Sequence, residues 1–125
     1  MSEPKAIDRR LAILDPVPME EAFGAIDEMA LETYGLFLTT TEPLLAQIGK
    51  HLVAAEFDAA ADAAHSAKGA ARMTGAFRLA DVCSALEQCS KERDMVSALE
   101  WLALVPDAFE EVSCAIAEAR AKSDP

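Results

Sequence analysis

The sequence has few aromatic and few basic residues. Of its 125 residues, 6% are aromatic, and 11 Lys and Arg stand against 22 Asp and Glu, so the formal net charge is −11. Nucleic acid is not expected as a partner, because binding to its phosphate backbone depends on clustered basic side chains. A chain of this length can bury roughly two-thirds of its unfolded surface in a single core. We therefore expect one acidic domain, with no room for a separate catalytic domain.

Paired cysteines and long apolar runs are also missing. Cys83, Cys89 and Cys114 are an odd number and lack the close paired spacing of zinc ligands, so we expect reduced thiols. The segment from Met1 to Leu14 is interrupted by charged residues and has no apolar run as long as a signal peptide or a membrane span. The sequence therefore predicts a cytoplasmic protein that is not attached to a membrane.

The apolar residues that are present follow a helical period. Most are Ala and Leu, and polar residues recur at intervals of three and four. Turn-forming residues then divide the chain into five predicted helices, which run from Pro18 to about Ile26, from about Glu28 to Ala54, from Asp58 to Thr74, across Leu79 to Leu86, and from Asp94 to about Ala121. We expect an all-α, up-and-down four-helix bundle over residues 16–122, with a short additional N-terminal helix, preceded by a loose arm of residues 1–15.

Several residues define the predicted helix ends and irregularities. Asp58 and Asp94 are expected as N-caps of the third and fifth helices, and Gly75 is expected to end the third. Pro43 predicts either a bend or an interruption near Thr39 to Thr41, and Pro106 predicts a kink in the last helix. Because a complete small bundle has no evident need to associate, we expect a monomer.

The third helix carries the most informative side chains. At about 100° per residue, its alanines gather on one side and His65 lies opposite them, facing solvent. Lys68 and Arg72 follow three and seven residues later and share the stripe of His65. Gly69 lies one turn after His65, where a glycine costs the helix about 1 kcal/mol relative to alanine. We interpret Gly69 as giving another molecule access to the imidazole.

This arrangement suits nucleophilic catalysis by histidine. A neutral ring nitrogen can attack phosphorus and form a phosphoramidate, which a second acceptor later takes. Lys68 could then meet the negative charge of the phosphoryl group, with Arg72 as a weaker second candidate. The alternative is an ordinary solvated polar face, which is the commoner explanation of such spacing when nothing else is considered.

The run HSAKGAARMTGA from His65 to Ala76, followed by Leu79, Cys83, Leu86 and Glu87, resembles the signature of the histidine-containing phosphotransfer (HPt) domain family. Members are four-helix bundles that relay phosphate between receiver domains. The resemblance implies that His65 is the phosphoacceptor, that Lys68 steadies the phosphoryl group and that Gly69 gives clearance. It further implies that Gly75 permits the turn into the next helix and that Glu87 contacts the ring nitrogen that is not phosphorylated, although a glutamate on a helix is more often solvated.

Ala67 and Thr74 depart from the family pattern, in which larger apolar residues are common at both places, and we interpret both as changes in core packing. The resemblance implies a bacterial-type phosphoryl-group carrier without kinase activity of its own. It would accept phosphate from the receiver domain of a hybrid histidine kinase and pass it to the receiver domain of a response regulator. No cofactor is expected, with Mg²⁺ belonging to the receiver. The alternative is a helical adapter that binds a receiver or a histidine kinase and never carries phosphate.

A second histidine and a group of apolar residues near the N-terminus each have a simple explanation. His51 lies near the end of the second predicted helix with no second His or Cys at ligand spacing, so we interpret it as helix-end polarity. Phe23, Ile26 and Met29 belong to the segment expected to cover one end of the bundle. Core packing is the simpler explanation for them, and an apolar docking patch for a receiver is the other.

Overall fold

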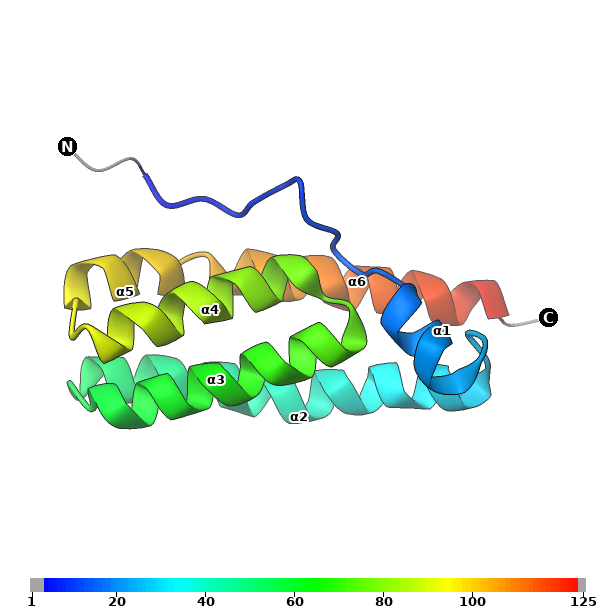
Figure 1. Cartoon of the computed structure of the whole chain (residues 1–125), viewed down its shortest axis with the longest axis horizontal. Helices are drawn as coiled ribbons and strands as arrows, with labels where there is room; N and C mark the ends of the chain where they lie inside the picture. Colours follow the sequence, from blue (N-terminus) through cyan, green and yellow to red (C-terminus); the bar gives the residue numbers. More distant parts are fainter. Residues whose placement is uncertain (1–3, 124–125) are drawn as a thin grey trace.

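The computed structural model describes residues 4–123, which form six α-helices. They are α1 (Val17–Phe23), α2 (Glu28–Val53), α3 (Phe57–Thr74), α4 (Phe77–Lys91), α5 (Met95–Leu102) and α6 (Val105–Ser123). Figure 1 shows α2, α3 and α4 as three long rods, with α5 and α6 end to end as the fourth and α1 at one end of the bundle. The predicted all-α four-helix bundle with an extra N-terminal helix is confirmed. None of the described helices is long and apolar enough to cross a membrane.

The core is built from large side chains on three of the rods and small ones on α3. Helix α3 packs mainly against α2 and α4. It buries six alanines, namely Ala60, Ala61, Ala63, Ala64, Ala67 and Ala71. The large, fully buried side chains come from the other helices and include Tyr34, Ile48, Leu52, Leu79, Leu86, Val112 and Ile116. Because the distance between packed helices depends on the side chains at their contact, the alanines let α3 approach its neighbours closely.

Helix α2 continues without a break through its proline. Its first turn is capped by Asp27, whose carboxylate accepts from the backbone N–H of Ala30 over 3.0 Å. Pro43 lies inside the helix and is exposed. The Thr40 hydroxyl donates to the carbonyl of Leu36 over 2.9 Å, so it bonds to the preceding turn within an intact helix. Of the two outcomes that Pro43 allowed, the interruption near residues 39–41 does not occur.

The start of α3 differs from the prediction, and its end agrees with it. Glu56 occupies the N-cap position without a side-chain hydrogen bond, and Asp58 lies in the first turn, so the prediction of Asp58 as the N-cap is wrong. The side chain of Phe57 packs against the core, and the helix begins at this residue, two positions earlier than an N-cap at Asp58 would allow. Asp58 still faces the positive end of the helix dipole. Gly75 ends α3 with φ of 95°, in the left-handed region that favours glycine.

The last predicted helix is two helices. Asp94 caps α5 as expected, accepting from the backbone N–H of Ser97 over 3.1 Å. The chain then leaves the helix after Leu102 and begins α6 at Val105, so the prediction of one helix kinked at Pro106 is wrong. Pro106 lies in the first turn of α6, where its missing N–H leaves no intrahelical bond unmade. Leu99, an apolar residue of α5, is 44% exposed.

The predicted N-terminal arm lies along the bundle in its described part, and residues 1–3 of it lie outside the described range (Figure 1). The backbone N–H of Asp15 donates to the Gly75 carbonyl over 2.8 Å. Arg78 donates from Nε to the Leu11 carbonyl over 2.7 Å and pairs with Glu111 at 2.8 Å. A Cβ at position 75 would collide with the Asp15 carbonyl, so this contact also requires glycine. The arm is thus fastened to the turn between α3 and α4.

Candidate functional site

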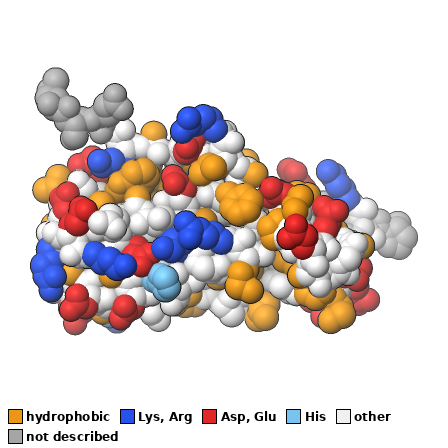
Figure 2. All heavy atoms as spheres, in the orientation of Figure 1, with side chains coloured by type: hydrophobic (Ala, Val, Ile, Leu, Met, Phe, Trp, Pro, Cys, Tyr) orange, Lys and Arg blue, Asp and Glu red, His pale blue; other side chains and the backbone are white. Residues whose placement is uncertain are grey.

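His65 lies in the middle of α3 on the face away from the alanines. Its side chain is 69% exposed, as the helical period predicted, because the alanine face is the one that packs against the other helices. Figure 2 shows a histidine side chain on the surface with Lys and Arg side chains gathered beside it. The imidazole is therefore open to another macromolecule and lies in a locally basic environment on an acidic protein.

The neighbouring helix α4 supplies the partner of His65. Nδ1 of His65 and Oε2 of Glu87 are 3.0 Å apart. Since an ionised carboxylate only accepts, Nδ1 is the nitrogen that donates, and the lone pair of the neutral ring is then on Nε2. Glu87 is only 6% exposed, so the expectation of a solvated glutamate is wrong at this position. The contact with the ring nitrogen that the family resemblance implied is present.

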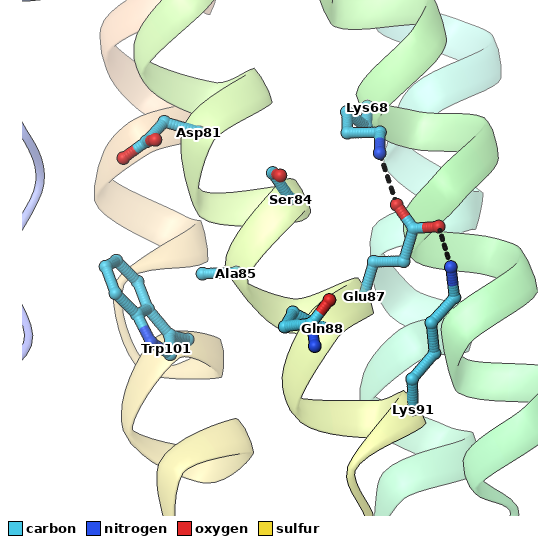
Figure 3. Close-up of a pocket in the computed structure, with 8 residues that line it drawn as sticks. All are labelled: Lys68, Asp81, Ser84, Ala85, Glu87, Gln88, Lys91 and Trp101. Atoms are coloured by element: carbon cyan, nitrogen blue, oxygen red, sulfur yellow. Dashed lines mark hydrogen bonds and ion pairs between the residues drawn. The ribbon is translucent and has the colours of Figure 1, made fainter.

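Two lysines from different helices share the same carboxylate. Lys68 on α3 donates to Oε1 of Glu87, and Lys91 on α4 pairs with Oε2 at 3.0 Å (Figure 3). Burial raises the pKa of Glu87, but the hydrogen bonds from Lys68, Lys91 and His65 outweigh burial and lower it from 4.5 to about 2. Glu87 is therefore ionised at neutral pH. Two ammonium groups and one carboxylate leave a single positive charge beside the imidazole, which favours an incoming anion.

The remaining predicted site residues differ in how they join this cluster. Gly69 is exposed, and a Cβ built on it would meet no atom within 4 Å, so the packing of the bundle does not require glycine there. The open space beside His65 is consistent with the predicted clearance. Arg72 is exposed on α3, and no hydrogen bond or ion pair within residues 4–123 connects it to His65 or Glu87. Its supporting role stays a prediction.

Lys91 is the residue of the cluster that sequence reasoning missed. It lies beyond the predicted fourth helix, which spans Leu79 to Leu86, whereas in the structure it is the last residue of α4. The signal was present, because Glu87 and Lys91 are four residues apart, which is the spacing of a stabilising acid–base pair on a helix. This spacing indicates a role for Lys91 in the site only when Glu87 is buried beside His65.

An apolar hollow of about 310 Å³ lies between α1, α2 and α3. Two large apolar side chains of its lining are exposed, Leu36 at 62% and Met73 at 79%, and Phe23 also lines it. The simpler explanation, core packing, is confirmed for Phe23 and Ile26 and does not hold for Met29. Phe23 and Ile26 both pack against the core, and Met29 is 62% exposed but does not line this hollow. Leu36 and Met73 are long apolar side chains on polar helix faces, which is the signal that could have revealed them.

The second histidine and the three cysteines lie outside the cluster around Glu87. His51 contacts Glu56 at 3.0 Å at the end of α2. Cys83 and Cys89 are buried and Cys114 is exposed, and burial raises the pKa of the Cys83 thiol to about 12. Within the described part of the chain, no group of three His, Cys, Asp or Glu residues could hold a metal ion.

Comparisons with known proteins identify the family and the fold of this chain. Residues 32–115 match the family model described as Hpt domain. The structure is similar to a crystal structure of histidine-containing phosphotransfer protein B (HptB) from Pseudomonas aeruginosa PAO1, with a TM-score of 0.81 and 21% identity over 90% of this chain and 97% of that one. It is also similar to an X-ray structure of a rice protein assigned as a histidine-containing phosphotransfer protein, with a TM-score of 0.69 and 18% identity over 88% and 84% of the two chains. A comparison with curated protein sequences gives no match.

Proposed function

Because the chain belongs to the Hpt domain family, it acts in histidine phosphotransfer within a phosphorelay, and we propose that His65 carries the phosphoryl group. The observation that supports this choice is the contact between the exposed His65 and the buried Glu87 at 3.0 Å. That contact holds the ring with Nδ1 protonated and Nε2 ready to attack. His51 lacks such support, because its glutamate partner is 58% exposed.

The proposed transfer is an in-line displacement at phosphorus. Nε2 of His65 forms a bond to the phosphorus of a receiver's aspartyl phosphate, while the bond from phosphorus to the aspartyl oxygen breaks and its electrons return to that carboxylate. The reverse step passes the group to a second receiver. Lys68 compensates the charge on the phosphoryl group, and Gly69 leaves room for the receiver to approach. Mg²⁺ belongs to the receiver's acidic pocket, since oxygen ligands are what this ion binds.

The apolar hollow between α1, α2 and α3 is the proposed docking surface for the receiver. It begins close to the site along α3, since Met73 lies one turn after Gly69 and Ala70 also lines it. Apolar contact there would fix the receiver while its aspartate reaches His65. The proposed partners are the receiver of a hybrid histidine kinase and the receiver of a response regulator. The proposed setting is a bacterial-type relay in the cytoplasm, with this chain acting as a monomer.

Labelling by a phosphorylated receiver tests the assignment. We expect the protein to acquire phosphate that is labile in acid and stable in alkali, as a phosphoramidate is. His65→Gln should abolish labelling while the far-ultraviolet circular dichroism stays unchanged, because the exposed His65 is not needed for packing. His51→Gln, the matched control, should label normally. Label that persists in His65→Gln would overturn the assignment of His65, and no labelling by a panel of receivers would favour the adapter function instead.

A further inference from the structure

The carboxylate of Glu87 holds three donors, and they differ in where they come from. Lys68 reaches Oε1 from α3, and its side chain is only 16% exposed. Lys91 and His65 both reach Oε2, at 3.0 Å each. Figure 3 shows Glu87 between the two lysines. The glutamate is thus bonded twice from the helix of the phosphoacceptor and once from its own helix.

A phosphoryl group on His65 would disturb this arrangement. Lys68 has been assigned to that group, and when its ammonium turns toward the phosphate it leaves Oε1 of Glu87. The buried carboxylate then has one ammonium partner fewer, which is unfavourable, since burial penalises the charge and the phosphoryl group adds further negative charge nearby. Without another cation, Glu87 would compete with the phosphoryl group for Lys68.

Lys91 is placed to resolve this competition. Its side chain is 60% exposed, and it contacts Oε2 rather than Oε1, so its bond to Glu87 does not depend on Lys68. The adjacent amide of Gln88 cannot take this role as it stands, because it donates to Glu92 over 2.8 Å. The four-residue spacing of Glu87 and Lys91 on α4 also keeps their contact independent of movement in α3.

We propose that Lys91 is a positioning residue, which holds the Glu87 carboxylate on His65 Nδ1 while Lys68 leaves it for the phosphoryl group. This inference rests on the function proposed above. In the transfer step the bond from Nε2 to phosphorus forms, the bond from phosphorus to the aspartyl oxygen breaks, and the Nδ1 proton stays on the ring. The resulting positive charge of the ring lies against Glu87, which Lys91 keeps in place. The retained proton makes His65 a good leaving group for the second transfer.

Single-turnover transfer from a phosphorylated receiver tests this role in four forms of the full chain: wild type, Lys91→Gln, Lys91→Arg and Lys50→Gln. Lys50 is the matched control, because it is an exposed lysine on α2. We expect Lys91→Gln to slow transfer by about two- to fivefold, the size of effect that the loss of a partly exposed ion pair allows. Lys91→Arg, which keeps the cation, should restore the wild-type rate, and Lys50→Gln should match wild type.

Nitrogen-15 spectra of the His65 ring provide a second readout that a general loss of stability would not produce. In wild type and Lys91→Arg we expect a proton on Nδ1 before and after phosphorylation, and in phosphorylated Lys91→Gln we expect that proton to be partly lost. Equal rates and ring spectra in wild type and Lys91→Gln would overturn the proposal, as would Lys91→Arg behaving like Lys91→Gln. Absence of labelling in wild type would instead overturn the proposed function itself.

Discussion

The two histidines of this protein make the same contact in two different settings. His65 and His51 each place Nδ1 3.0 Å from a glutamate oxygen. In the first pair the side chain of the histidine is 69% exposed and that of the glutamate 8% exposed. In the second pair the side chains are 29% and 58% exposed. The first pair joins residues 22 apart in the sequence, on two helices, and the second joins residues 5 apart at one helix end.

The difference shows that burial of the acceptor, rather than the hydrogen bond itself, distinguishes a site. An exposed pair such as His51 and Glu56 is separated easily by water and contributes little. A buried glutamate has a fixed position, and two lysines keep it ionised, so it can hold the ring of His65 in one orientation. The proposal of His65 as the phosphoacceptor rests on this difference, since His65 is exposed while its glutamate partner is buried.

The largest effect is expected from the removal of Lys68, because the pair of His65 and Glu87 then loses the cation that α3 supplies. We expect Lys68→Ala to slow transfer onto His65 by about ten- to a hundredfold, since the phosphoryl charge loses its nearest compensating group. The same variant should shorten the lifetime of the phosphohistidine. Single-turnover labelling by a phosphorylated receiver, followed by decay of the label, measures both, and wild-type kinetics in Lys68→Ala would remove the lysine from the mechanism.

The two histidines also differ in the residue four positions further along the chain, which is Gly69 after His65 and Ala55 after His51. Substitution of Gly69 tests whether this difference matters. Gly69→Ala should raise the free energy of unfolding by about 0.5–1 kcal/mol, since the added Cβ has open space and alanine favours the helix. Gly69→Gln, with its long side chain, should slow transfer from the receiver. Urea unfolding and the labelling assay give the two readings.

The matched control for this prediction is Gly49→Ala, at a helical glycine in α2 where a Cβ would make ordinary contact with Leu102 at 3.6 Å. It should stabilise the fold in the same way and leave transfer unchanged. If Gly69→Gln transferred phosphate as fast as wild type, the space beside His65 would have no part in docking.

The smallest effect that we expect is on the free energy of unfolding at low pH, where variants of Glu87 and Glu56 should differ. The pKa of Glu87 falls from 4.5 to about 2 on folding, so its ionised form stabilises the folded state. That contribution is complete above about pH 5 and is lost as the pH falls toward the folded pKa. We expect the stability gap between wild type and Glu87→Gln to shrink over this range in urea unfolding. Glu56→Gln, at an exposed pair, should change the free energy of unfolding little. A constant gap for Glu87→Gln would contradict the assignment.

Local chemistry allowed much of the fold to be predicted. The glycine at position 75 ends α3 and Asp94 caps α5 because both act on the nearest turn of backbone, which the sequence displays directly. The predictions of Asp58 as an N-cap and of Pro106 as a kink were wrong, because tertiary packing determines at which residue these helices begin. Phe57 moved one helix start, and the break before Val105 turned an expected kink into two helices.

The site was predictable where it depends on one helix and not where it depends on two. The exposure of His65 and the position of Lys68 follow from the period of α3. The burial of Glu87 does not, because it is fixed by how α4 is rotated against α3, and no short-range pattern reports that rotation. Lys91 was overlooked for the same reason, although its spacing from Glu87 was visible.

The alanine face of α3 has a consequence for the entropy of docking. An alanine side chain has no rotamers to choose among, so the contact of α3 with α2 and α4 offers few alternative packings. The conformational freedom of the helix that presents His65 is therefore lost once, when the chain folds, and not again when a receiver arrives. What remains to be ordered at that moment is confined to long exposed side chains such as Met73, so the relay protein meets each of its receivers with a surface that is already in its final shape.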